Sequence, residues 1–373
     1  MRFNQIKTFY NPLQACESHA DKNYSKSPLK PKKLIQFLKD NQLIKYFDIH
    51  SAFPALTKND LLTAHTVEYV DNFLEGKGNC ESNGLKWSKE FSEAVLMNNA
   101  SFYAAIRNSV VNPQEISFSP SSGFHHARPN RGSAFCTFSG QVISSLKIWE
   151  EFKMAGCYLD LDGHFGNSIE DSRSFAPNLN HAIPPGFNFN PRLYDAEYFG
   201  EVENFIENTL EPALLAGQIH YIVWCHGADS HKEDQLGDQC STEWWMKCAD
   251  YFWQWVREMD AKLGRNLPVS CALFGGYRDD DFNSVLSLHT GDLMSCVKNC
   301  IEIDVDYQVI VNQEKGEMDL FDLKKTHSTC ILFLFLLNQS LQFINNRFID
   351  NFPWKIFISK MPIRCRLSIN WLP

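Results

Sequence analysis

The chain has 373 residues, of which 44% are apolar and 13% aromatic, enough to bury a large core and to exclude a disordered or fibrous protein. Its 35 basic and 44 acidic side chains give a net charge of −9, which argues against a nucleic-acid binder that relies on phosphate neutralisation. The one basic cluster is expected to be a solvated loop that runs into a helix, and it comprises Lys22, Lys26, Lys30, Lys32 and Lys33.

Short apolar runs that are typical of buried strands alternate along the chain with longer stretches of helical spacing. The runs span residues 115–119, 157–162, 221–225 and 269–274, and the helical stretches span 89–109, 139–155, 195–216 and 242–263. This alternation predicts an α/β fold, a single domain of three layers with a mainly parallel sheet covered by helices on both faces. Ligands of such sheets bind beyond the carboxyl ends of the strands, so the residues that follow each run are the candidate site.

The twelve cysteines include no CxxC pair, and several lie inside apolar runs. We therefore expect reduced thiols and an intracellular protein. The first twelve residues have no apolar core of signal-peptide length. The strongest hydrophobic run, 330–337, is too short to cross a bilayer. These features predict a soluble, cytoplasmic protein.

A D-x-D-x-H pattern ends the run at 157–162 and places Asp160, Asp162 and His164 at a spacing of two. Aspartates and a histidine at a strand end suit a divalent metal with mixed oxygen and nitrogen ligands. Asp229 follows the next run and would complete a set of three ligands with an open position for water. The alternatives are a solvated strand end for the first group and a turn or N-cap aspartate for Asp229.

Two further groups follow strand-like runs. His125 and His126 come after a glycine turn, where paired imidazoles can serve as general base and acid beside a metal-activated water. Tyr277 follows two glycines, where a phenol can donate to a developing oxyanion. A partly exposed loop and a core tyrosine are the structural alternatives for these two groups.

The ordered series SGFHHA…FC, LDLDGHFGN, GADSHKEDQLGD and GGY resembles the histone deacetylase family. Members of that family are zinc-dependent deacetylases with the arginase–deacetylase fold, and they include acetylpolyamine and acetoin-utilisation relatives. The resemblance runs from about Asp60, in a segment that looks like the family's early histidine-and-tyrosine helix, to about Asp292.

The resemblance implies a role for each motif residue. The zinc ligands would be Asp162, His164 and Asp229, with a bound water as nucleophile. Asp160 would orient the first histidine of the pair, and Asn167 falls where many members have a second orienting aspartate. It further implies that Tyr277 polarises the acetyl carbonyl, that Phe135 and Phe187 form walls of an acyl-lysine channel, and that a monovalent cation (K⁺) binds near Asp160.

Three positions depart from the family pattern. Phe165 replaces a histidine that is usual after the zinc ligand, Phe274 stands where glycine is common, and Glu233 stands where glycine is frequent. None of these departures removes an expected metal ligand.

The chain is therefore expected to be a zinc-dependent amidohydrolase that removes an acetyl group from lysine of a protein or peptide, without nucleic-acid or membrane partners. The alternatives are an acetylpolyamine deacetylase and a catalytically weak acyl-lysine-binding or scaffold protein. The acidic run 279–281 would attract cationic substrates or form a solvated loop. We expect a catalytic domain over residues 1–312 and an irregular tail, 313–373, with a peripheral role.

Overall fold

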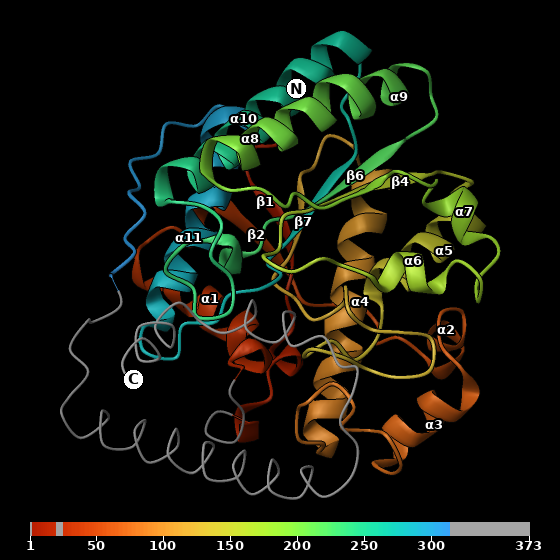
Figure 1. The fold of residues 1–373 in the computed structure, drawn as a ribbon. Coiled ribbons are helices and arrows are strands. Elements are labelled where there is room, and N and C mark those ends of the chain that lie inside the picture. The colour runs from red at the N-terminus through yellow and green to blue at the C-terminus, as the bar shows by residue number, and fades with distance from the viewer. Residues whose placement is uncertain (1, 20–24, 314–373) are drawn as a thin grey trace, which may run out of the picture. The chain divides into compact units, whose positions relative to one another are not determined.

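The computed structural model describes residues 2–19 and 25–313, and it places a single parallel sheet at the centre of this part of the chain (Figure 1). Its seven strands lie in the order β2-β1-β3-β7-β6-β4-β5. They are β1 Ile6–Phe9, β2 Phe47–His50, β3 Ser117–Ser119, β4 Gly156–Asp160, β5 Asn188–Phe189, β6 Tyr221–Cys225 and β7 Val269–Ala272. All paired strands are parallel, so the predicted α/β fold class is confirmed.

The central strands are buried on both faces, which is why they appear in the sequence as unbroken apolar runs. In β6, the side chains of Ile222 and Trp224 belong to one core cluster, whereas those of Tyr221, Val223 and Cys225 belong to the other. Successive side chains of a strand point to opposite faces, so β6 supplies both hydrophobic layers.

Helices form the two outer layers (Figure 1). Five helices contribute to the first core cluster, the one that contains Ile222 and Trp224 of β6. They are α1 Lys30–Asp40, α8 Asp195–Phe205, α9 Glu211–Leu215, α10 Thr242–Leu263 and α11 Phe282–Ser295. Those of the second are α2 Lys58–Leu62, α3 Val67–Glu75, α4 Lys89–Val111, α5 Gly140–Phe152, α6 Ser168–Ser172 and α7 Leu179–Ala182. Short 3₁₀ turns cover Pro12–Gln14, Glu17–His19, Ser27–Leu29, Ile44–Tyr46 and Ala228–Ser230, and π turns cover Ile206–Leu210 and Cys296–Cys300.

The helical stretch expected at 195–216 is interrupted. The α-helical pattern stops after Phe205, a π turn follows over Ile206–Leu210, and α9 resumes with Pro212 in its first turn. Proline has no backbone N–H to donate and its ring crowds the preceding turn, so a regular α-helix cannot pass through this position. The period of apolar residues continues across the interruption, which is why the sequence suggests one helix.

The last described residues, from Ile301 to Gln313, contain no helix or strand. The side chains of Ile303, Val305 and Tyr307 nevertheless pack against the core formed with α10 and α11. The expected boundary after residue 312 stays a prediction, because residues 314–373 lie outside the described part of the chain. No helix within 2–19 or 25–313 is long and apolar enough to cross a membrane.

Candidate metal centre and active site

The carboxyl ends of four neighbouring strands bring the predicted site residues to one edge of the sheet. His125 follows β3, Asp160 is the last residue of β4, Asp229 follows β6 and Tyr277 follows β7. These strands are adjacent in the order β3-β7-β6-β4, so residues far apart in the sequence meet in one place.

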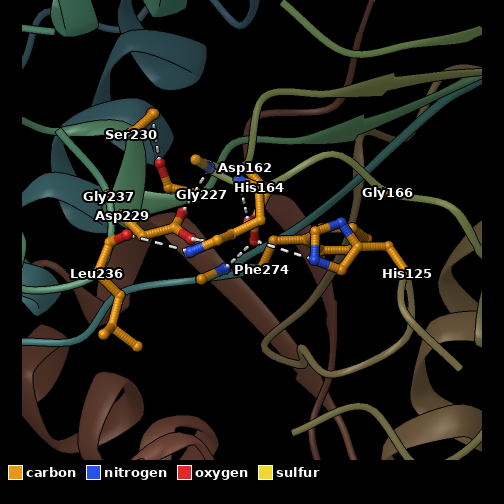
Figure 2. Close-up of polar contacts among 12 residues, drawn as sticks. His125, Asp162, His164, Gly166, Gly227, Asp229, Ser230, Leu236, Gly237 and Phe274 are labelled. Atoms are coloured by element: carbon orange, nitrogen blue, oxygen red, sulfur yellow. Dashed lines mark hydrogen bonds and ion pairs between the residues drawn. The ribbon is translucent and has the colours of Figure 1, made fainter. Parts of the chain in front are cut away.

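Asp162, His164 and Asp229 form a cluster whose potential ligand atoms all lie within 4.8 Å of one another. Nδ1 of His164 lies 2.9 Å from Oδ2 of Asp229 and 3.1 Å from Oδ1 of Asp162. Nε2 of the same ring lies 3.1 Å from the carbonyl oxygen of Leu236. Figure 2 marks this contact with a dashed line. A carbonyl can only accept, so Nε2 carries the hydrogen and Nδ1 is left to face the carboxylates.

Backbone N–H groups hold the two carboxylates in place. Gly275 donates to Oδ2 of Asp162 at 2.9 Å, and Gly163 donates to Oδ1 of Asp229 at 3.0 Å. A Cβ atom at Gly275 would collide with the carboxyl group of Asp229. The first glycine of the GGY motif is therefore required by the close approach of the backbone to the cluster.

The cluster concentrates negative charge in a buried place. Burial, together with the neighbouring carboxylate of Asp162, raises the pKa of Asp229 to about 8. Hydrogen bonds to Asp162 and Asp229 raise the pKa of His164 to about 11. In the absence of a metal, protons on His164 and on Asp229 therefore limit the negative charge that the cluster carries.

This donor set fits a divalent zinc ion. One imidazole nitrogen and two carboxylates are ligands that zinc accepts, and three protein ligands leave a position for water. The second nitrogen of the imidazole donates to a carbonyl, the arrangement that orients metal-bound histidines. A divalent cation would also replace the proton on His164 as the positive charge between the carboxylates.

His125 and His126 lie side by side, with their ring centroids 4.1 Å apart. Nδ1 of His125 lies 3.0 Å from Oδ2 of Asp160, and Nδ1 of His126 lies 2.9 Å from Oδ1 of Asn167. The structure thus places Asp160 beside His125 and Asn167 beside His126, and the orienting role of these two residues stays a prediction. The ring of His126 lies 6.2 Å from that of His164, which belongs to the metal cluster.

The two histidines have opposite electrostatic environments. Burial alone would lower the pKa of His125, but the carboxylates of Asp162 and Asp160 outweigh it and raise this pKa to about 9. Burial and the neighbouring charge of His125 lower the pKa of His126 to about 4. Without a metal, His125 is thus the protonated member of the pair at neutral pH and His126 the neutral one.

Tyr277 lies beside the cluster, with its ring centroid 6.1 Å from that of His164 and 5.6 Å from that of Phe135. Burial, followed by the carboxylates of Asp162 and Asp229, raises its pKa well above the usual value. The phenol therefore keeps its hydrogen at neutral pH. Phe187 packs against the core that contains α8 and α10, and its role as a channel wall stays a prediction.

Two buried charged residues lie beside the cluster where the sequence does not predict them. Lys30, expected in a solvated loop, is fully buried, and its Nζ donates to the carbonyl oxygen of Phe274 at 2.5 Å. Asp234 accepts backbone N–H groups of Tyr277, at 2.6 Å, and of Leu236 and Gly237. Asp234 therefore links the segment after β7, which carries Tyr277, to the turn at Leu236. The carbonyl oxygen of Leu236 contacts the ring of His164.

The acidic run after Tyr277 is part of the local structure. Asp280 binds the guanidinium of Arg278 through two hydrogen bonds of 2.8 and 2.7 Å. Asp281 caps α11 by accepting from the backbone and hydroxyl of Ser284, and Asp279 lies 3.4 Å from Nζ of Lys26. The three carboxylates are thus engaged within the fold.

The early His65 segment supports the loop that carries the paired histidines. Nε2 of the buried His65 accepts from the backbone N–H of Ser139 at 2.9 Å, and its Nδ1 donates to the carbonyl oxygen of Arg128 at 2.9 Å. The hydroxyl of Tyr69 donates to the carbonyl oxygen of Thr137 at 2.7 Å. Residues 128–139 are therefore anchored to the segment that begins α3.

His65 is expected to make the fold sensitive to acid. Burial lowers its pKa to about 4, whereas an unfolded chain would titrate near its usual value of 6.5. Below pH 6.5 the unfolded state binds a proton on His65 that the folded state does not bind. The free energy of unfolding therefore falls as the pH drops towards 4. At 1.36 kcal/mol per pKa unit the loss reaches about 3 kcal/mol.

Urea unfolding between pH 7 and 5 measures the first part of this loss, about 2 kcal/mol, with His65→Gln as the comparison. The variant is less stable at pH 7, but its free energy of unfolding should fall less steeply with decreasing pH. Parallel curves for the two proteins would contradict the assignment.

Comparisons with known proteins show what this chain is similar to in sequence and in fold. A family model described as the histone deacetylase domain matches residues 24–182. The HD domain of HDA15, a solved structure, is similar in fold, with a TM-score of 0.59 at 13% identity, and the match covers 82% of this chain and 91% of that one. The match of the family model supports the histone deacetylase family for residues 24–182 of this chain.

Two curated relatives show the extent of the sequence similarity. Histone deacetylase 8 of Xenopus laevis is 26% identical over 156 residues, which are 36% of this chain and 48% of that protein. Histone deacetylase B of Dictyostelium discoideum is 28% identical over 168 residues, 40% of this chain and 39% of that protein. The matches thus span about half, or less, of these relatives.

The family match includes the paired histidines and the D-x-D-x-H motif but ends before Asp229 and Tyr277. These two residues are placed at the site by the strand order of the sheet rather than by the matched sequence.

Proposed function

We propose that this chain is a zinc-dependent amidohydrolase that removes an acetyl group from the lysine side chain of a protein or peptide. The observation that carries the proposal is the convergence of the Asp162–His164–Asp229 cluster, the paired histidines and Tyr277 at one sheet edge. Each group alone has a structural explanation, whereas together they supply every function that hydrolysis of an amide requires.

The chemistry assigns a role to each side chain. Zinc held by Asp162, His164 and Asp229 would polarise the amide carbonyl and lower the pKa of a bound water. The neutral His126 accepts the proton of the attacking water, and a protonated His125 supports its charge and supplies a proton to the departing amine. The hydroxyl of Tyr277 donates to the carbonyl oxygen as negative charge develops on it. Acetate and a free amine result.

The surroundings of the site favour acetyl-lysine over an acetylated polyamine. Phe165 and Leu236, which adjoin the cluster, are 47% and 42% exposed, so apolar side chains border it. The nearby carboxylates at 279–281 are engaged with Lys26, Arg278 and the start of α11. A polycation would require acceptors that are free to bind it.

The decisive experiment measures metal content and turnover on the purified chain. We expect one zinc per chain and release of acetate from an acetyl-lysine peptide, with lower kcat/KM on acetylated polyamines. Turnover should stop on chelation and return with added zinc. A zinc-bound protein that binds the peptide without hydrolysing it would instead indicate an acyl-lysine-binding protein, and preferential polyamine turnover would change the substrate class.

A monovalent cation near Asp160 is a further part of the proposal. The carbonyl oxygen of Asp160 already accepts from Nδ2 of Asn190 at 2.5 Å, so K⁺ would compete with this amide for the same oxygen. Potassium should therefore raise the thermal midpoint more in Asn190→Ala than in the wild type, and equal shifts in the two proteins would count against a cation at this oxygen.

A further inference from the structure

A chain of polar contacts extends outward from His126. Its Nδ1 lies 2.9 Å from Oδ1 of Asn167, and Nδ2 of Asn167 donates to Oδ2 of Asp171 at 2.5 Å. The same Asp171 oxygen lies 3.1 Å from Nε of Arg128. His125, in contrast, contacts a carboxylate directly, that of Asp160.

Asn167 by itself does not determine which ring nitrogen of His126 carries the hydrogen, whereas an aspartate at this position would. An ionised carboxylate only accepts, so it always selects the tautomer whose Nδ1 carries hydrogen. A side-chain amide has an acceptor at one end and a donor at the other. Asn167 can therefore accept from a protonated Nδ1 or, after a flip of its amide, donate to a bare Nδ1.

Asp171 removes this ambiguity. Its carboxylate is paired with Arg128 and has no hydrogen to donate, so the NH₂ group of Asn167 must face it. Oδ1 of Asn167 then faces His126, whose Nδ1 must carry the hydrogen and whose Nε2 keeps a free lone pair. We propose that Asp171 is a positioning residue which, through the orientation of Asn167, fixes the tautomer of His126.

The local fold is suited to this role. Asn167 immediately precedes α6, and the backbone N–H of Asp171 donates to the Asn167 carbonyl at 2.9 Å. Residues four apart in such a turn lie on the same face, so their side chains meet. The signal in the sequence is an Asn-x-x-x-Asp spacing directly after the metal motif.

The consequence concerns the reaction, and the inference here rests on the proposed function. A water can give its proton to His126 only if Nε2 has a free lone pair. In the opposite tautomer, Nε2 carries the hydrogen and His126 can only donate. Without Asp171, part of the protein would hold His126 in this inactive state.

The first test reverses the charge at Asp171. In Asp171→Lys a donor replaces the acceptor, so the amide of Asn167 should flip towards it. We expect kcat on an acetyl-lysine peptide to fall about tenfold or more, but by less than the full loss of a general acid–base group, which contributes roughly 10²–10⁴-fold. KM and zinc content should stay unchanged.

Glu170→Lys is the matched control, because it makes the same charge change one residue away. Glu170 binds Arg173 through both carboxylate oxygens, so its side chain is directed to a different partner from that of Asp171. Its kcat should stay close to that of the wild type. Equal losses in the two variants would show that surface charge is responsible and would overturn the proposal.

Rescue provides the second test. In Asn167→Asp, a carboxylate contacts His126 directly and selects the tautomer without help from residue 171. Adding Asp171→Lys to Asn167→Asp should therefore cause no further loss of kcat. A loss as large as in the native Asn167 background would mean that Asp171 acts by another route.

The third test does not depend on turnover. In ¹⁵N spectra of imidazole-labelled protein, His126 should be neutral with hydrogen on Nδ1, and Asp171→Lys should shift it towards the Nε2–H form. Glu170→Lys should not. An unchanged tautomer in Asp171→Lys overturns the proposal, whereas absence of acetate release by the wild type, with the tautomer shift still present, refutes only the proposed function.

Discussion

Asp229→Asn is expected to abolish zinc binding under conditions in which the wild-type chain holds one ion. The substitution keeps the size of the side chain, and the new amide oxygen can still accept from the backbone N–H of Gly163. It removes the negative charge that faces Nδ1 of His164 at 2.9 Å. Loss of an outer partner of a metal ligand typically costs 10–100-fold in affinity, so loss of a ligand itself should cost more.

The stability of the metal-free variant is the more discriminating result. Burial and the neighbouring Asp162 raise the pKa of Asp229 to about 8, so the folded metal-free protein gains nothing from its charge. Asp229→Asn should thus be at least as stable as the wild type without metal. Zinc at a hundred times its Kd stabilises a folded protein by about 2.7 kcal/mol, and the variant should lose this increment.

Asp292→Asn serves as the control for removal of a buried carboxylate. Asp292 accepts from the indole N–H groups of Trp224 and Trp253 at 2.9 and 2.8 Å and is not part of the metal cluster. The control should lose stability and keep its zinc. Unchanged zinc content in Asp229→Asn, measured by elemental analysis after dialysis, would contradict the ligand assignment.

The central sheet and the grouping of the site are predictable because both rest on strong local patterns. Buried parallel strands such as β6 are continuous apolar runs, and parallel topology sends their carboxyl ends to one edge. The edge strand β2 escapes prediction because Asp48 and His50 interrupt it and, of its four side chains, only that of Phe47 is buried. The two-residue β5 is too short to leave any pattern.

The contacts around the cluster could not be predicted, because they depend on tertiary burial. Lys30 lies among lysines that are exposed, such as Lys32 and Lys33, and only the packing of α1 buries it. The conformation and packing of Phe274 likewise could not be predicted from the sequence. It has a positive φ of 54°, strained for a side chain with a Cβ, and its ring packs against Phe124 and His125.

Tyr277→Phe is expected to keep bound zinc and lose most turnover. The backbone of Tyr277 is fixed independently of its hydroxyl, because its N–H donates to Asp234 at 2.6 Å and its carbonyl accepts from Gln235 at 3.2 Å. The phenylalanine ring should therefore occupy the same place beside Phe135. Only the donor to the developing oxyanion is removed, which typically costs about 3–4 kcal/mol, or roughly 10²–10³ in kcat.

Tyr307→Phe is a matched control, because it also removes a hydrogen-bonded hydroxyl. The Tyr307 hydroxyl lies 3.0 Å from Oγ of Ser287, on α11, and takes no part in the site. Its loss should cost about 1 kcal/mol of stability and leave kcat unchanged. Because the pKa of Tyr277 is raised well above its usual value, the wild-type phenol is a donor throughout the neutral range, so the deficit of Tyr277→Phe should be the same at pH 7 and pH 8. A near-normal kcat in Tyr277→Phe would mean that the phenol only packs against Phe135, and that other groups at the sheet edge stabilise the oxyanion.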